Sequence, residues 1–155
     1  MWLKEVMIML VQTFTKENFF DMDPMHDCDI SHLSFEDKTL VITYDNLDEG
    51  IVDPDGEPIY KHKKLVARYE FESYCDVFWR GKKKYGVIDF YKDPDEFYKT
   101  FKNHTFRSYK YSIDCFNELS LYIDLHKLKN GKVKQSKFYE LKILLDAKKI
   151  TYTWE

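Results

Sequence analysis

Hydrophobic and polar residues alternate along most of the chain, which is the pattern of half-buried β-strands. The connections between the alternating segments are short, and parallel pairing requires long crossovers, so we expect antiparallel neighbours. The predicted strands cover residues 30–35, 40–45, 65–72, 76–80, 85–91, 109–115, 119–126, 139–145 and 150–154.

Turn residues separate these segments. Asp37-Lys38 predicts a tight turn, and Asp53-Pro54-Asp55-Gly56 predicts a turn within an acidic connection. Gly81–Lys84 is expected to close a hairpin, and Asn130-Gly131 is the dipeptide typical of a primed two-residue hairpin turn. The chain therefore reads as a succession of hairpins.

Two segments predict helix. Asp93 is placed to cap a helix over residues 93–103, with Pro94 at its first position. Residues 2–14 fit a helical stripe, although the apolar run Val6–Val11 fits a buried strand equally well. We expect helix there, as part of an N-terminal helical segment within residues 1–20.

The resulting fold class is mainly antiparallel β with a minor helical part (α+β). We expect a curved meander sheet of seven to nine strands or a partly open barrel, covered by the 93–103 helix and the N-terminal segment. With 155 residues, the chain is one domain, 1–155, with a β-rich body over 25–155. Its 44% hydrophobic content excludes a disordered protein.

Cysteine usage indicates a reducing compartment. The 3 cysteines, Cys28, Cys75 and Cys115, are odd in number and far apart, unlike the dense even sets of secreted scaffolds. No Cys-x-x-Cys pair predicts zinc, and no cofactor motif is present. The chain lacks a long apolar run and a signal-peptide pattern. We expect a cytoplasmic protein with no membrane association.

The net charge of −3 conceals an asymmetry. Residues 1–59 hold 3 Lys/Arg and 14 Asp/Glu, a balance of −11, while residues 60–155 hold 21 and 13, a balance of +8. The two halves can pair with each other on folding, or they can form a dipolar surface that steers a charged partner. Basic runs at 61–64 and 80–84 keep nucleic acid as an alternative partner, which the acidic half disfavours.

One segment combines aromatic and basic residues. Trp, Tyr and Arg dominate binding hot spots, so this segment is our candidate surface for a partner protein. Core packing with cross-strand aromatic pairs is the alternative interpretation. The candidate residues are Trp79, Arg80, Lys82, Lys83 and Tyr85.

A polar cluster around His26-Asp27-Cys28, with His32 nearby, holds the densest set of reactive side chains. It allows a Cys–His pair or a metal site, but it lacks a second pair of ligands, so we predict no metal. Turn formation by His26 and Asp27, with Cys28 packed inward, is the simpler interpretation. Signatures of phosphate-binding loops, serine hydrolases and zinc peptidases are missing, which favours a non-catalytic protein.

The stretch Met25-His26-Asp27-Cys28-Asp29-Ile30, followed by Leu33–Asp37 and Leu40-Val41-Ile42, resembles the opening of small, uncharacterised β-rich bacterial proteins of the immunity-protein style. The resemblance covers about residues 25–44 and implies a bacterial, cytoplasmic binding module without catalytic residues. We therefore expect a protein that binds another protein. A small-molecule-binding or hydrolytic β-barrel is the alternative, and a nucleic-acid binder acting through the basic loops is a further one.

Overall fold

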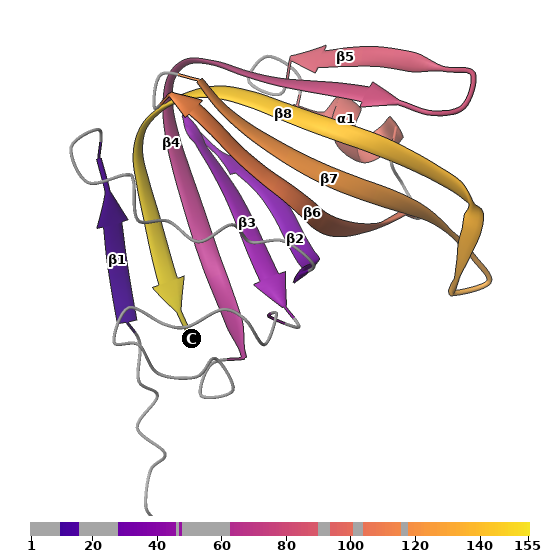
Figure 1. The fold of residues 1–155 in the computed structure, drawn as a ribbon, viewed down its shortest axis with the longest axis horizontal. Helices are drawn as coiled ribbons and strands as arrows, with labels where there is room; N and C mark the ends of the chain where they lie inside the picture. The colour runs from indigo at the N-terminus through magenta and orange to yellow at the C-terminus, as the bar shows by residue number, and fades with distance from the viewer. Residues whose placement is uncertain are drawn as a thin grey trace, which may run out of the picture.

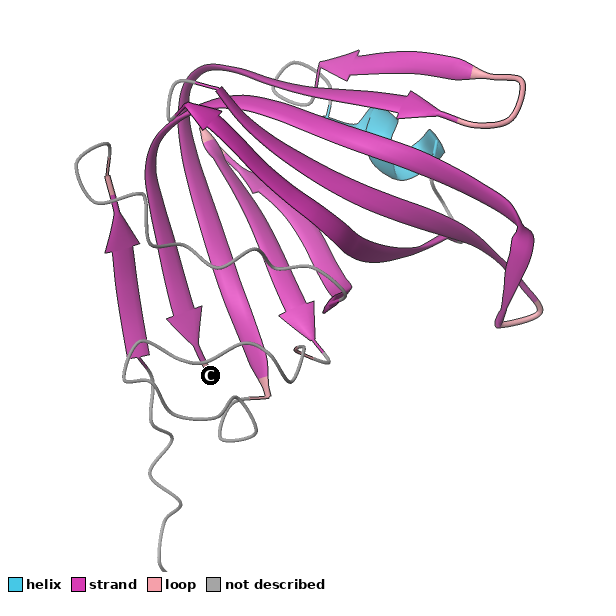
Figure 2. Cartoon of the chain, in the orientation of Figure 1, coloured by secondary structure: helices cyan, strands magenta, loops and turns pink. Residues whose placement is uncertain are grey.

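The structure is a computed structural model that describes residues 10–15, 28–45, 47, 63–89, 94–100, 104–115 and 118–155. These residues form one eight-stranded sheet and one short helix (Figures 1 and 2). The elements are β1 (Leu10–Phe14), β2 (Cys28–Glu36), β3 (Thr39–Asp45), β4 (Lys64–Arg80), β5 (Tyr85–Asp89), α1 (Pro94–Thr100), β6 (His104–Cys115), β7 (Glu118–Lys129) and β8 (Lys132–Trp154).

Every strand pairing among the described residues is antiparallel, which confirms the mainly antiparallel β part of the predicted fold class. The strand order is β1-β8-β7-β6-β2-β3-β4-β5, and β4 also pairs with β8. The pairings therefore lead from β2 through β3, β4, β8, β7 and β6 back to β2. The sheet curls into a half-barrel (Figure 1), and β1 and β5 lie outside this circuit as edge strands.

The two longest strands, β4 and β8, bend and run through both parts of the curled sheet (Figure 1). The first part of β4 lies between β3 and the end of β8, and its last part lies between β5 and the middle of β8, residues 140–145. The register of β4 against β8 shifts between Glu70 and Cys75. Long strands that bend in this way turn the corner of a barrel without ending. Two pairs of predicted strands, 65–72 with 76–80 and 139–145 with 150–154, are thus two continuous strands.

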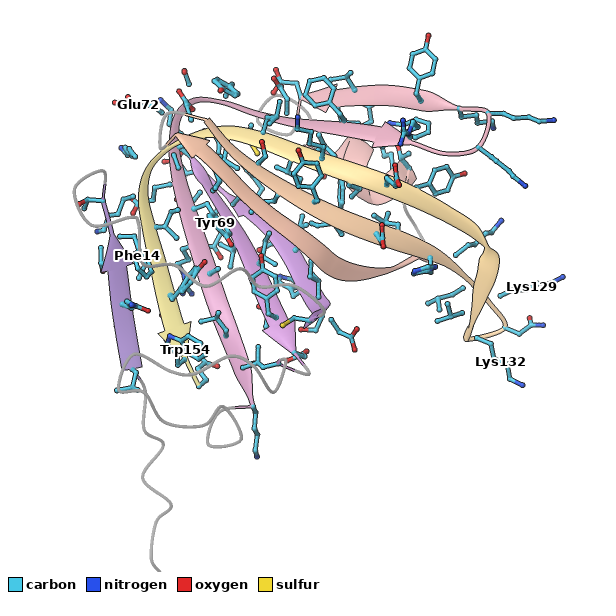
Figure 3. All side chains as sticks on the ribbon, in the orientation of Figure 1. Phe14, Tyr69, Glu72, Lys129, Lys132 and Trp154 are labelled. Carbon is cyan, nitrogen blue, oxygen red and sulfur yellow. The ribbon has the colours of Figure 1, made fainter. Side chains whose placement is uncertain are left out.

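Asp146 of β8 holds the bend of β4 in place. Its carboxylate accepts the main-chain N–H groups of Glu72 at 3.2 Å, Ser73 at 3.0 Å and Tyr74 at 3.0 Å, and it also accepts the Ser73 hydroxyl. Desolvation by itself would raise the pKa of Asp146, but the hydrogen bonds from Ser73 and Tyr74 outweigh it and leave the pKa lowered. Glu72, labelled in Figure 3, marks this bend.

The interior is one cluster of buried aliphatic and aromatic side chains contributed by the strands and by α1. Phe14, Tyr69 and Trp154, labelled in Figure 3, belong to it and come from β1, β4 and β8. The hydroxyl groups of Tyr44 on β3 and Tyr69 on β4 form a hydrogen bond with 3.1 Å between the two oxygens. A buried hydroxyl needs such a bond, because desolvation without one is costly.

The turns follow the predictions where the structure describes them. Asp37 has a φ of 50°, and Asn130 and Gly131 have φ of 52° and 74°. Positive φ at both central residues is the requirement of a type I′ hairpin turn, so the prediction for Asn130-Gly131 is confirmed. Asp53–Gly56 lies outside the described residues.

The predicted helix is present as α1 over Pro94–Thr100, with Pro94 at its first position. Asp93 and residues 101–103 lie outside the described residues. Phe97 attaches the helix to the core cluster, since only 1% of it is exposed. Asp95 and Glu96 occupy the first turn, where carboxylates suit the helix dipole.

The predicted N-terminal helix is wrong for residues 10–14, which form β1, and residues 1–9 and 16–20 lie outside the described residues. β1 pairs with β8 from Leu10–Trp154 to Phe14–Ile150. The edge of β8 provides main-chain hydrogen-bond partners for this segment. Because side chains of a strand alternate between its two faces, Phe14 points into the core, where the centroid of its ring lies 5.2 Å from that of Tyr152. In the described part of the chain, no helix has the length and apolarity to cross a membrane.

Candidate functional site

The β4–β5 hairpin carries the residues predicted to contact a partner (Figure 1). Gly81 donates its N–H to the Lys84 carbonyl at 2.7 Å, which closes the turn around Lys82 and Lys83. Beyond the turn, Arg80 pairs with Tyr85. Two of the predicted basic residues and Tyr85 are therefore held at one end of a hydrogen-bonded hairpin, and all three are exposed.

One face of this hairpin points to solvent. It comprises Phe78, Arg80, Tyr85 and Val87, which pair across the strands as Phe78–Val87 and Arg80–Tyr85; we call it the hairpin outer face. Tyr85 is 84% exposed, Val87 58% and Phe78 39%. Exposed large apolar side chains that share one patch are a mark of interaction surfaces. Phe78 and Val87 were not among the candidate residues, although each lies two positions along its strand from one of them and therefore on the same face.

Arg80 is oriented by an ion pair with Glu140 on β8, at 2.5 Å between the guanidinium and the carboxylate. The Arg80 side chain is still 74% exposed and that of Glu140 38% exposed. An ion pair so open to water contributes little to stability. Its effect is to direct the guanidinium toward β8, on the side of β4 away from Tyr85, where it remains open to a second carboxylate.

The turn of the hairpin is strongly basic. Lys82, Lys83 and Lys84 are consecutive and exposed, and Arg80 lies one residue before Gly81. Such a cluster at a projecting turn raises the local positive potential and speeds encounter with an acidic surface.

Trp79 lies on the opposite side of the hairpin from Arg80, because neighbouring residues of a strand point to opposite faces. It is half-buried and packs against the core cluster. Its ring lies over Gly86, the cross-strand partner, and meets the ring of Tyr139 edge to face at 5.8 Å. Tyr139 in turn covers Gly81. The structure therefore brings Arg80, the lysines and Tyr85 together and places Trp79 behind them, in the role of a support.

The second predicted cluster does not come together in the described residues. Cys28 is fully buried, while His32 is exposed on the same strand. The register of β2 against β3 shifts between Ile30 and His32. Because of this shift, the side chain of His32 lies on the opposite face of the strand from that of Cys28, although the two residues are an even number of positions apart. His26 and Asp27 lie outside the described residues. In the part of the chain that the structure describes, no group of three His, Cys, Asp or Glu residues could hold a metal ion.

The two basic runs proposed for nucleic acid lie at opposite ends of β4 (Figure 1). Lys64 begins the strand and binds Glu155 at 3.1 Å, whereas Arg80 ends it. Residues 61 and 62 lie outside the described residues. The two runs therefore do not form one continuous basic stripe along the described chain.

A basic group missed by the sequence analysis occupies the tip of the β7–β8 hairpin. Lys127, Lys129 and Lys132 are exposed there, and Figure 3 shows the labelled Lys129 and Lys132 on either side of the turn, far from the core. Lys129 pairs with Lys132 across the strands. Like charges directly opposite each other oppose pairing, so the Asn130-Gly131 turn must set the register here. The signal was available in the spacing of lysines about that turn.

Carboxylates of β7 and β8 meet on the outward side of the sheet. Asp124 pairs with Glu140. Burial raises the pKa of Asp124, Glu140 raises it further, and His126 opposes the change. Arg80 binds Glu140 and thus offsets part of this repulsion. The Arg80–Glu140 ion pair thus links the hairpin outer face to β8, and the Asp124–Glu140 pair links β8 to β7.

The described thiols are poor nucleophiles. Cys28 and Cys75 are both buried and form no disulfide. Burial raises the pKa of Cys75 far above its ordinary value, and the carboxylates of Asp76, Asp89 and Asp146 act in the same direction. Reactive cysteines need the opposite environment, which stabilises a thiolate.

Comparison of the chain with protein-family models, with curated proteins and with solved structures found no match.

Proposed function

We propose that this protein is a non-catalytic binding module of the immunity-protein style, cytoplasmic and bacterial, and that it recognises an acidic protein through the hairpin outer face. The observation that carries the proposal is the exposure of Tyr85, at 84%, between a basic turn and Val87. An aromatic side chain with this much exposed surface contributes little to packing within the described chain. It is a typical hot-spot residue once a partner desolvates it.

Electrostatics support an acidic partner. Arg80 is the cross-strand partner of Tyr85, and the three turn lysines directly precede Tyr85 in the chain. The Glu140 carboxylate is the counter-charge that binds Arg80. Long-range attraction would set the rate of encounter, and burial of Tyr85, Val87 and Phe78 would set the lifetime of the complex.

The rigidity of the hairpin also supports recognition. Trp79 and Tyr139 pack over the two glycines of the hairpin and attach it to the core. A surface that is ordered before binding loses less conformational entropy in the complex.

The test is site-specific photo-crosslinking in bacterial cells, with the crosslinking amino acid placed at Tyr85 and, as control, at Val11, which is 63% exposed on β1. A protein crosslinked only from position 85 is then purified and its Kd measured against wild type, Tyr85→Ala and Val11→Ala. We expect at least about tenfold weaker binding for Tyr85→Ala alone, as for a hot-spot residue worth more than 1.4 kcal/mol.

Two results would overturn the proposal. One is a crosslinking pattern that does not differ between positions 85 and 11. The other is capture of nucleic acid instead of protein, with an affinity that falls steeply with salt, which would establish the nucleic-acid alternative.

A further inference from the structure

In the described sheet, the outer edge of β5 has no strand paired with it. β5 ends the strand order, and among the described residues no strand pairs with its side away from β4 (Figures 1 and 2). Natural edge strands are commonly protected by proline, by lysine within the strand or by a bulge. The sequence of β5, Tyr-Gly-Val-Ile-Asp, contains neither proline nor lysine, and its register against β4 runs without a shift.

The hydrogen-bond pattern of the hairpin identifies the groups at this edge. The bond from Gly81 N–H to the Lys84 carbonyl makes Gly81 and Lys84 a hydrogen-bonded pair. Antiparallel pairs alternate, so Gly86 and Ile88 exchange hydrogen bonds with β4, whereas Tyr85 and Val87 occupy non-hydrogen-bonded pairs. The main-chain N–H and C=O groups of Tyr85 and Val87 consequently point away from β4. The two residues with the most exposed side chains in this strand, Tyr85 and Val87, are thus among the residues whose main chain faces the open edge, together with Asp89 at the end of the strand.

We infer that β5 is the site at which the partner adds a strand: an extended, acidic segment pairs with the main chain of Tyr85 and Val87 and extends the sheet. This inference rests on the proposed function and names the form of the partner's contact. Strand addition obtains affinity from main-chain hydrogen bonds and specificity from alternate side chains.

The positive charge beside β5 favours an acidic segment as the added strand. Lys82, Lys83 and Lys84 directly precede β5, so a strand laid along β5 runs past three exposed ammonium groups at one end. On the outward side, its alternate side chains would lie beside Tyr85 and Val87, which favours apolar residues at those positions. A segment with alternating apolar and acidic residues fits both requirements.

The probe is an acetylated and amidated eight-residue peptide of alternating valine and glutamate, added to ¹⁵N-labelled protein. Amide hydrogen exchange at β5 is the readout. We expect the Tyr85 and Val87 amides to exchange rapidly in the free protein and to become protected when the peptide binds, while Gly86 and Ile88 stay protected throughout. The same peptide with lysine in place of glutamate should bind at least about tenfold more weakly, because it meets the turn lysines with like charge.

Two matched variants separate the main chain from the side chain. Val87→Pro removes an N–H that makes no bond to β4, so the hairpin is retained, whereas Val87→Ala keeps that N–H and removes only apolar contact. Strand addition predicts a loss of peptide affinity of about tenfold or more for Val87→Pro and a smaller loss for Val87→Ala. Preserved protection of the Gly86 and Ile88 amides in the free Val87→Pro variant verifies that the hairpin still forms.

The outcomes distinguish this inference from the proposed function. Peptide binding that leaves Tyr85 and Val87 exchanging rapidly, with equal losses for both variants, overturns strand addition and leaves the hairpin outer face as the contact. No binding at millimolar peptide also overturns strand addition. The proposed function itself is decided by the Tyr85 crosslinking experiment, which does not depend on the peptide.

Discussion

Trp79 lies so close to Gly86, its partner across the β4–β5 hairpin, that a Cβ atom added to the glycine would be 2.5 Å from the indole nitrogen. The contact lets an aromatic side chain shield a glycine that would otherwise weaken the strand. It also attaches β5 to the core, since Trp79 packs against the core cluster.

Gly86→Ala should therefore destabilise the protein by about 1–3 kcal/mol, because the indole must move out of a packed position. Elsewhere, alanine in place of glycine often raises stability by reducing the entropy of the unfolded chain, so the sign of the effect is informative. Urea unfolding provides the measurement. In a Trp79→Leu background the cost should shrink, since the clash is gone, and an equal cost in both backgrounds would show that the ring is not responsible.

Asp146 predicts an acid-sensitive bend in β4. Its pKa is lowered in the folded state, so its contribution to stability is present above the unfolded pKa of about 3.9 and is lost as the pH falls through the folded value. Asp146→Asn should cost about 1–2 kcal/mol at pH 7, a range kept low because the group is largely open to water. The measurement is urea unfolding of both proteins between pH 7 and pH 3.

The difference between wild type and Asp146→Asn should close toward the acid end of this range. Ser73→Ala is the matched control, since it removes one donor and leaves the three main-chain donors of Glu72, Ser73 and Tyr74 in place. Its cost should be smaller than that of Asp146→Asn. A pH-independent difference would mean that the carboxylate charge has no part in holding the bend.

Asp124 should show the opposite behaviour. Its raised pKa means that the charged form is disfavoured in the folded state, so ionisation above the unfolded pKa lowers stability. Asp124→Asn should raise the free energy of unfolding at pH 7 by a few tenths of a kcal/mol, roughly, with the gain limited by solvent screening. The gain should vanish below about pH 3, where the wild-type carboxyl is protonated in both states.

Glu140 provides a check on the cause. Because Glu140 also raises the pKa of Asp124, Glu140→Gln should lower that pKa, which NMR titration of the Asp124 carboxyl carbon would measure. An unchanged Asp124 titration would attribute its shift to burial alone.

The hydroxyl contact between Tyr44 and Tyr69 should be sensitive to removal of one partner. Tyr69→Phe leaves the buried Tyr44 hydroxyl without this bond and should cost about 1–3 kcal/mol. Replacing both tyrosines by phenylalanine should cost less than the sum of the two single changes. Chemical denaturation of the four proteins tests this, and simple additivity would show that the contact does not contribute.

These tyrosines also set an alkaline limit. Burial raises the pKa of both phenols well above the ordinary value, so the protonated form is favoured in the folded state. Stability should fall as the pH rises above about 10, where the unfolded chain ionises. In an ultraviolet titration, we expect the phenols of Tyr44 and Tyr69 to ionise only with unfolding. Ionisation of all tyrosines before any loss of near-ultraviolet circular dichroism would contradict this prediction.

Local signals in the sequence predicted most of the local structure. Asn130-Gly131 determined a turn because few other residues accept positive φ at both positions, and Pro94 determined the start of α1 because its fixed φ suits a first helical residue. The alternation over 119–125 determined which face of β7 is buried. The predicted turn at Gly81–Lys84 placed Arg80 and Tyr85 close together, because the register of a hairpin follows the length of its turn.

Only the tertiary structure decided the features that depend on distant segments. Residues 10–14 became a strand because β8 presents an edge to them, and the bend of β4 exists because Asp146, more than seventy residues further along the chain, accepts its main-chain N–H groups. The side to which Trp79 points depends on where the core lies, since both faces of a strand rich in aromatic residues look alike in sequence. Turn and cap preferences act over a few residues and can be recognised in them, whereas the pairing of edges and the choice of the buried face result from the whole sheet closing on its core.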